Sequence, residues 1–230
     1  MDHPFFNKSR KEQRQIQLFV GIVGLFVIIL SATISWILGI YVFWFLVTAI
    51  TLSIVAPFFD IPAMKRRGAL IYYSPLFLSE KLKKGVLKIH GGTLFDYVFV
   101  IDKRSSGAQR TRLILQCYVE GLLSLIDTYQ GSGSNEIKVR GTSYIINKRT
   151  AGRLGFRVVQ TDGLQKLILL YNYFNVLITL SLVKGKFSFP SMSSVISFES
   201  TIEGLSKRKV FLKELHYKLK DQSRLGLLEE

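Results

Sequence analysis

A run of 45 residues near the N-terminus, from Gln15 to Phe59, contains no charged side chain. A helix needs about 20 apolar residues to cross a bilayer, so the run has room for two spans and is too long for one. We therefore expect membrane-spanning helices at about residues 16–35 and 36–58, with the turn between them near residues 31–39. A cleaved signal peptide is the alternative for the first span. It is disfavoured because a second apolar stretch follows at once and no small-residue cleavage site is present.

The charges on either side of this run predict its orientation. Four basic residues precede the first span and three follow the second, whereas the connection between the spans is uncharged. Because basic residues are retained on the cytoplasmic side, we expect an integral membrane protein with two spans and both termini in the cytoplasm. The basic residues are Lys8, Arg10, Lys11 and Arg14 before the first span, and Lys65, Arg66 and Arg67 after the second.

The chain after the hairpin is strongly basic. Residues 61–230 contain 27 Lys and Arg against 13 Asp and Glu, and they contribute most of the formal net charge of +15. Positive charge next to a membrane attracts anionic headgroups, so we expect anionic membrane lipids to be a binding partner. Nucleic acid is the competing explanation of the charge, and it is disfavoured because no known nucleic-acid-binding motif accompanies the basic residues. The single cysteine, Cys117, rules out an intramolecular disulfide.

These features predict a membrane-anchored α+β protein, with an N-terminal two-helix transmembrane hairpin followed by one cytoplasmic mixed α/β domain. The expected boundaries divide the chain into five segments. They are a basic cytoplasmic N-terminus (1–15), the transmembrane helical hairpin (16–59), a basic juxtamembrane or interfacial segment (60–85), the α+β domain (86–200) and a basic amphipathic C-terminal helix (201–230).

Residues 72–85, YYSPLFLSEKLKKG, have the end signals of a short helix. Ser74 suits the N-cap, Pro75 the first helical position and Gly85 the position after the last turn. We expect this helix either to lie on the lipid headgroups or to pack on the domain. The basic residues that we expect to contact lipid are Lys65, Arg66, Arg67, Lys81, Lys83 and Lys84.

The stretch KIHGGTLFDYVFVI, residues 88–101, places a histidine, two glycines and an aspartate close together. Both flanks favour β-strand, and a Gly-Gly pair allows the positive φ that a type I′ turn needs. We therefore predict a β-hairpin with Gly91 and Gly92 in its turn and His90 at a surface corner. A catalytic or ligand-binding loop is the alternative, and it keeps His90 and Asp96 as candidate residues.

Residues 108–130 have the length and the apolar spacing of a helix, with Cys117 in its middle. A buried free cysteine usually behaves as a small hydrophobic residue, and that is the role we expect. In the catalytic alternative, Cys117 is the nucleophile and His90 its base, with Asp96 or Asp102 orienting the imidazole. The protein would then be a transferase or hydrolase acting at the membrane surface.

Residues 136–163 follow the pattern of a strand, a short helix and a second strand. Asn147 or Thr150 would cap the helix, and Arg149 and Arg153 would lie one turn apart on it. Such a pair could bind an anionic group. A solvated basic face is the alternative and the more common outcome.

The segment 164–186 contains 17 uncharged residues from Leu167 to Val183, which is the short end of the length that spans a bilayer. Asn172 and Asn175 argue against a third span, because unpaired amides are costly in lipid. We expect a buried helix or one that rests on the membrane, with the third span as the alternative. The tail after residue 201 has leucines on one face and lysines around them, which predicts the amphipathic helix.

The sequence contains no P-loop, no dinucleotide-binding glycine motif, no HExxH zinc motif and no CxxC pair, so we expect no metal and no cofactor. The leading hypothesis is a membrane-anchored accessory or assembly protein whose basic cytoplasmic domain docks on anionic lipid and a protein partner. The enzyme with a Cys117/His90 dyad is the second hypothesis. Tethering of nucleic acid to the membrane is the third.

Overall fold

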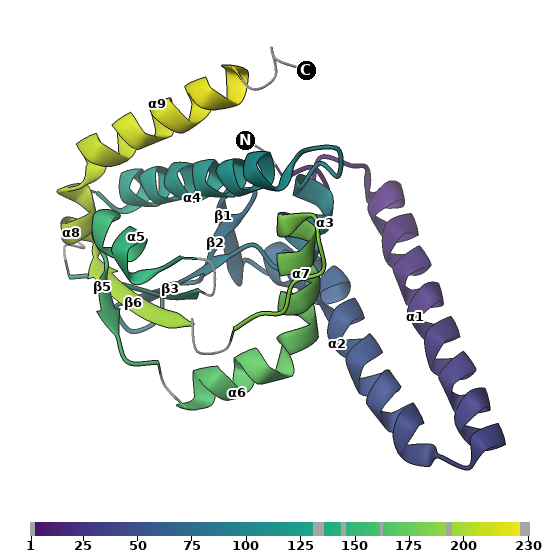
Figure 1. The fold of residues 1–230 in the computed structure, drawn as a ribbon. Coiled ribbons are helices and arrows are strands. Elements are labelled where there is room, and N and C mark those ends of the chain that lie inside the picture. The colour runs from purple at the N-terminus through teal and green to yellow at the C-terminus, as the bar shows by residue number, and fades with distance from the viewer. Residues whose placement is uncertain (1–2, 131–135, 144–145, 162, 192–194, 226–230) are drawn as a thin grey trace.

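The computed structural model describes residues 3–130, 136–143, 146–161, 163–191 and 195–225. The chain consists of two long apolar N-terminal helices followed by a domain of helices packed on a mixed β-sheet (Figure 1). The two helices lie side by side and project from the domain, which contacts the second helix from its middle to its C-terminal end, whereas the turn between the helices lies away from the domain.

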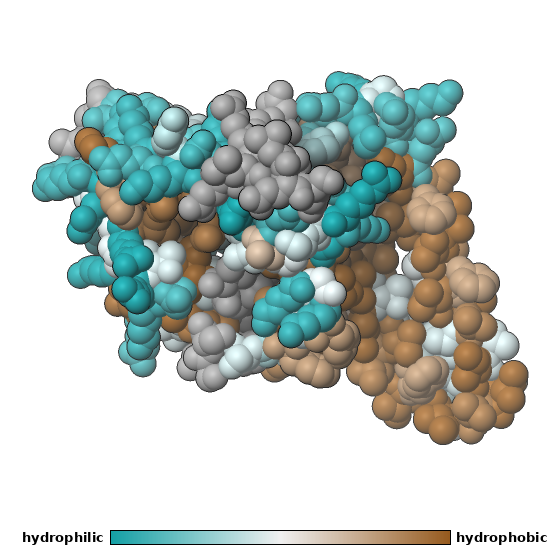
Figure 2. Space-filling model, turned by 45° about the horizontal axis from the view of Figure 1, so that its top comes forward, coloured by the Kyte–Doolittle hydropathy of each residue, from teal (hydrophilic) through white to brown (hydrophobic). Residues whose placement is uncertain are grey.

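Helices α1 (Arg10–Leu38) and α2 (Tyr41–Arg66) form the projecting pair, with the turn between them at Gly39 and Ile40. By length and composition alone, each helix is long and apolar enough to cross a membrane. Many of their apolar side chains are exposed; Phe19, for example, is 68% exposed. Figure 2 shows the pair as a largely apolar surface beside a more polar domain. The turn falls at the C-terminal edge of the region that the sequence predicts.

Two prolines inside α2 leave two backbone carbonyls without their helical donors. Proline has no N–H, so Pro57 and Pro62 cannot donate to the carbonyls four residues earlier, at Ser53 and Phe58. Side-chain amides from two other helices replace the missing donors, which ties both helices to α2. The two hydrogen bonds, each 2.9 Å long, run from Gln17 Nε2 to the Phe58 carbonyl and from Asn175 Nδ2 to the Ser53 carbonyl.

The domain is built on a six-stranded sheet in the order β1-β2-β3-β4-β6-β5. Strands β3 and β4 are parallel, and the other neighbouring strands are antiparallel. Parallel neighbours need a crossover connection, which α3 and α4 supply. The strands are β1 (Leu70–Ser74), β2 (Phe77–Glu80), β3 (Val86–Gly91), β4 (Lys138–Ser143), β5 (Arg157–Val159) and β6 (Ile196–Thr201).

Helix α4 packs against the sheet and forms the main core with it (Figure 1). The helix and the sheet approach closely at Gly121, where an added Cβ would lie 2.5 Å from Phe77 of β2. At the end of β1, the Ser74 hydroxyl donates to the Cys117 carbonyl at 2.6 Å. The helices of the domain are α3 (Leu94–Val100), α4 (Gly107–Tyr129), α5 (Lys148–Arg153), α6 (Gly163–Tyr171), α7 (Tyr173–Lys184), α8 (Ile202–Ser206) and α9 (Lys209–Leu225).

Several elements lie where the sequence predicts them. Helix α4 is the one expected over residues 108–130, and Asn147 caps α5. The tail is helical but is divided into α8 and α9, and residues 226–230 lie outside the described residues. The apolar segment 164–186 is broken at Asn172 into α6 and α7, nine and 12 residues long. At about 1.5 Å per residue neither helix is long enough to cross a bilayer, which argues against a third span.

The helix predicted within residues 72–85 is wrong, because this segment forms β1, a tight turn and β2. Ser74 and Phe77 pair across the turn that contains Pro75. The three consecutive side chains after Pro75 are all buried. A run that is buried on both faces has no clear periodicity, and proline suits a turn as well as it suits the start of a helix.

The hairpin predicted at Gly91 and Gly92 is also wrong, because the glycines are followed by helix α3. Neither glycine has the positive φ that a type I′ turn needs. Gly91 is required for close packing instead, since an added Cβ would overlap the Tyr118 hydroxyl. Asp96 accepts a hydrogen bond from the Thr93 N–H and so caps the first turn of α3. This cap and the packing of the helix override the strand propensity of the segment.

Candidate functional site

A basic cleft lies at the end of the hairpin opposite its turn, between the first turns of α1 and the last turns of α2. Its volume is about 750 Å³. Five of the eight described residues that line it are cationic, and none of these eight is acidic. The lining residues are Phe6, Arg10, Lys11, Gln13, Arg14, Gln17, Lys65 and Arg66.

A capping box fixes the α1 side of the basic cleft. The Glu12 N–H donates to the Ser9 hydroxyl oxygen at 3.3 Å, and the Ser9 N–H donates to Glu12 Oε2 at 2.8 Å. Hydrogen bonds from the hydroxyl and the N–H of Ser9 lower the pKa of the Glu12 carboxyl. Because α1 begins at Arg10, Arg14 follows about one turn later on the same side, and both side chains reach the cleft.

Lys65 forms part of the α2 side. Its ammonium lies 3.5 Å from the centroid of the Phe6 ring and 5.3 Å from that of the Tyr72 ring, in cation–π contact. Gln17 lines the cleft toward the apolar part of the hairpin, where its amide is bound to the Phe58 carbonyl. The basic cleft therefore borders the apolar surface of the hairpin, and Figure 2 shows hydrophilic residues gathered at this end of it.

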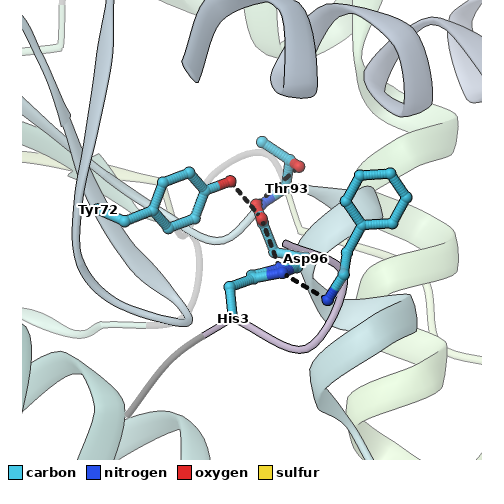
Figure 3. A network of polar contacts seen from close by, with 5 residues as sticks. His3, Tyr72, Thr93 and Asp96 are labelled. Atoms are coloured by element: carbon cyan, nitrogen blue, oxygen red, sulfur yellow. Dashed lines mark hydrogen bonds and ion pairs between the residues drawn. The ribbon is translucent and has the colours of Figure 1, made fainter. Parts of the chain in front are cut away.

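A network of polar side chains around a buried carboxylate lies next to the cleft (Figure 3). Asp96 is fully buried at the start of α3. Its Oδ2 accepts from the Thr93 N–H at 2.6 Å and from the Thr93 hydroxyl at 2.8 Å, and its Oδ1 accepts from the Tyr72 hydroxyl at 2.5 Å. Burial, and then the charge of Asp96, raise the pKa of Tyr72, so the phenol keeps the proton that it donates.

His3 approaches the same carboxylate from the N-terminal segment. Its Nε2 lies 3.2 Å from Asp96 Oδ1, which is ion-pair distance without the alignment of a hydrogen bond. The Phe5 N–H donates to His3 Nδ1 at 3.2 Å, so Nδ1 carries no proton and the proton of the neutral ring is on Nε2. The ring also stacks on Phe95, with centroids 5.4 Å apart. The network thus joins the N-terminal segment, β1 and α3.

Aromatic side chains surround this network and form a second core at the base of the hairpin. Phe5 and Phe95 are fully buried with ring centroids 4.8 Å apart. Phe58 of α2 and Phe99 of α3 pack edge-on against Phe95. The segment that carries Phe6 into the cleft is therefore held between α2 and α3, which fixes the relative positions of the cleft walls.

The three candidate catalytic residues lie in different surroundings. Cys117 is fully buried in α4, and burial raises the pKa of its thiol to about 12. His90 is exposed on β3 with Nε2 3.2 Å from Glu80 Oε1, and this contact lowers the pKa of Glu80. Asp96 is bound to Tyr72 in the buried network. A thiol that stays protonated at neutral pH is a poor nucleophile, so these surroundings disfavour the Cys117/His90 dyad.

Two of the six basic residues expected to contact lipid line the basic cleft, one ends α2 next to it, and three are exposed in the turn between β2 and β3. That turn lies beside the end of α2, because the Lys81 N–H donates to the Ala69 carbonyl at 3.1 Å. Lys65 and Arg66 are the two that line the cleft, and Arg67 is the C-cap residue that follows α2. Lys81, Lys83 and Lys84 are the three in the turn. The predicted anion-binding pair, Arg149 and Arg153, is exposed on α5.

Our interpretation of the sequence missed part of this site. It used Arg10 and Arg14 only as evidence for orientation, and it gave His3 no role. The pattern Ser-x-x-Glu at residues 9–12 was a usable signal, since it marks a helix start and places both arginines in the first turns. The position of His3 had no such signal, because it depends on a contact with Asp96, far away in the chain.

Comparisons with known proteins give this site no assignment. No protein-family model, no curated protein and no solved structure matches the chain. Guanidinium and ammonium groups arranged around an open cleft suit a phosphate or carboxylate ligand. Among the described residues, no group of three His, Cys, Asp or Glu side chains could hold a metal ion.

Proposed function

We propose that this chain is a membrane-anchored accessory protein whose cytoplasmic domain binds the headgroups of anionic lipids in the basic cleft and holds a protein partner at the membrane. The observation that carries the proposal is the position of the cleft. It lies where the apolar surface of α1 and α2 ends, and five cationic side chains line it. A ligand bound there would have a charged part in the cleft and an apolar part along the helices, as a phospholipid does.

The length of the hairpin agrees with this position. As a helix, residues 41–59 of α2 extend about 28 Å, close to the hydrocarbon thickness of about 30 Å. With these residues in the hydrocarbon, Arg10 and Arg66 lie at the level of the lipid phosphates. Each basic residue near an anionic surface contributes about 1 kcal/mol of attraction, and a cleft of about 750 Å³ has room for a phospholipid headgroup.

The proposed partner would contact the domain away from the hairpin. Helix α9 packs on α4 through the fully buried Leu212, yet it leaves Val210 and Tyr217 more than 70% exposed among its lysines. Exposed apolar and aromatic side chains of this kind are common at protein interfaces. Purification in mild detergent from the native membrane tests this part of the proposal. A partner at fixed stoichiometry supports it, and a chain that purifies alone contradicts it.

Neutralising the cleft is expected to remove the preference for anionic lipid. The full chain with Arg10→Gln, Arg14→Gln and Arg66→Gln should lose at least about tenfold in its selectivity for phosphatidylglycerol over phosphatidylcholine, because three charges of about 1 kcal/mol each are removed. Native mass spectrometry of the lipids that the detergent-purified chain retains measures this selectivity. Raising the salt concentration should weaken binding by the wild-type chain, since salt screens the charges.

A variant with the same change in net charge is the control. Lys213→Gln, Lys218→Gln and Lys220→Gln alter exposed residues on α9, far from the cleft, and should leave the selectivity intact. The corresponding changes at Lys81, Lys83 and Lys84 should have an intermediate effect, because that turn lies beside the cleft rather than in it. Equal losses in the cleft and α9 variants would show that only the total charge matters, which contradicts a headgroup site.

A further inference from the structure

Helix α6 exposes an apolar surface beside the hairpin. Its C-terminal end lies beside α2 and leads directly into α7, which rises from it toward α4 (Figure 1). All four of the α6 side chains that the structure describes are apolar or aromatic, and they are between 51% and 70% exposed. They are Leu167, Ile168, Leu170 and Tyr171. Such a surface is stable in contact with an apolar phase and costly in water.

The level of α6 along the hairpin is set by contacts with the middle of α2. The Asn175 amide donates to the Ser53 carbonyl at 2.9 Å, and the Ser53 hydroxyl donates to the Tyr171 carbonyl at 3.4 Å. Ser53 lies about 10 Å along the helix from Asp60, the first charged residue after the apolar run. The junction between α6 and α7 is therefore well below the charged end of the hairpin.

Two backbone carbonyls at this junction, those of Ser53 and Ile168, accept hydrogen bonds from side-chain amides of the chain. Pro57 leaves the Ser53 carbonyl without a helical donor, and the Asn175 amide supplies one. The Asn172 amide donates to the Ile168 carbonyl at 2.9 Å, which caps the end of α6. Irregular backbone at membrane depth is tolerated where protein groups satisfy it. The two asparagines that argued against a third span are thus the residues that allow a helix break in lipid.

We infer that α6 is inserted in the cytoplasmic leaflet, with its exposed side chains against lipid acyl chains, and that α6 and α7 form a re-entrant element docked on α2. The inference rests on the proposed function in one respect, since it requires the hairpin to be in the membrane. A depth of about 10 Å agrees with that of helices that lie in the interface plane. The domain then has two membrane contacts, the hairpin and α6, so that it cannot pivot freely about the hairpin.

Spin labelling of the full chain in lipid nanodiscs tests this placement. Cysteines are introduced one at a time at Leu167 and Leu170, with Phe19→Cys of α1 as the lipid reference and Val210→Cys of α9 as the water reference. All four positions are more than 60% exposed, so the label should not disturb packing, and the buried Cys117 should take up no label in the wild-type chain. The accessibility of each label to oxygen and to a water-soluble nickel complex is then measured.

The expected result is a ratio of oxygen to nickel accessibility at Leu167 and Leu170 close to that at Phe19 and severalfold higher than that at Val210. High nickel accessibility on α6 with Phe19 in lipid overturns the inference alone. Low accessibility to both reagents would mean that protein covers α6, which also overturns it. If Phe19 itself is accessible to nickel, the membrane anchor fails together with the inference. Loss of headgroup selectivity in the cleft variant should not alter the α6 labels.

Discussion

Asp96→Ala is expected to lower the free energy of unfolding by about 3–5 kcal/mol, the largest effect of any single change at the site. The variant leaves the Tyr72 hydroxyl, the Thr93 N–H and the His3 Nε2–H without the carboxylate that they face. All of these groups meet at a fully buried position, where water cannot replace the lost acceptor. The first turn of α3 also loses its cap, and the N-terminal segment loses its polar attachment.

Asp102→Ala is the matched control. Asp102 is exposed and accepts a hydrogen bond from the Arg104 N–H at 2.9 Å, so its replacement should change stability by no more than about 0.5 kcal/mol. Urea unfolding of the full chain in one detergent, followed by circular dichroism, compares both variants with the wild type. Equal and small effects of the two changes would show that the buried network does not stabilise the protein.

Asn175→Leu is expected to destabilise the full chain by about 1–3 kcal/mol, because it removes the donor to the Ser53 carbonyl that Pro57 leaves free. The same change should have a smaller effect in a chain that already carries Pro57→Ala. The alanine N–H restores the helical hydrogen bond to the Ser53 carbonyl, so the Asn175 amide is then needed only for its second hydrogen bond, to the Ser53 hydroxyl at 3.1 Å. The measurement is a double-mutant cycle on unfolding free energies in detergent.

A second cycle serves as the control for the first. Gln17 bonds the Phe58 carbonyl, which Pro62 and not Pro57 leaves free. Gln17→Leu and Pro57→Ala should therefore give additive effects, within about 0.5 kcal/mol. Additive effects for the Asn175 and Pro57 pair as well would show that α7 is not held to α2 by the proline-freed carbonyl.

The parts of the fold that the sequence predicts well are those with a local cause. The charge-free run from Gln15 to Phe59 requires two long apolar helices, and the spacing of apolar residues around Cys117 requires helix α4. The strand before Gly91 lies where the sequence predicts it, as β3. The helix predicted within residues 72–85 and the hairpin predicted at Gly91 and Gly92 are wrong because the deciding forces are not local. Strand β2 is covered on both faces by the core, and Gly91 packs against Tyr118 from a distant helix. Neither contact can be read from neighbouring residues.

The candidate site likewise has features that the sequence predicts and contacts that depend on the folded structure. The basic residues around the hairpin are visible in the sequence, because charges next to an apolar run stand out. Pro57 and Pro62 were also visible, and each predicts a carbonyl that needs another donor. The identity of the two donors, Gln17 and Asn175, depends on how the helices pack. The pairing of His3 with Asp96 likewise exists only after the N-terminal segment folds onto α3.

The central claim, that the hairpin spans a membrane with the basic cleft on the cytoplasmic side, is tested most directly by cysteine labelling in sealed right-side-out vesicles. Leu38→Cys, beside the turn, and Val210→Cys, on α9, are 62% and 72% exposed, and the buried Cys117 provides a silent background. A maleimide that cannot cross membranes should label Leu38→Cys in sealed vesicles and Val210→Cys only after permeabilisation. Labelling of Val210→Cys in sealed vesicles, or protection of Leu38→Cys there, would contradict the claim.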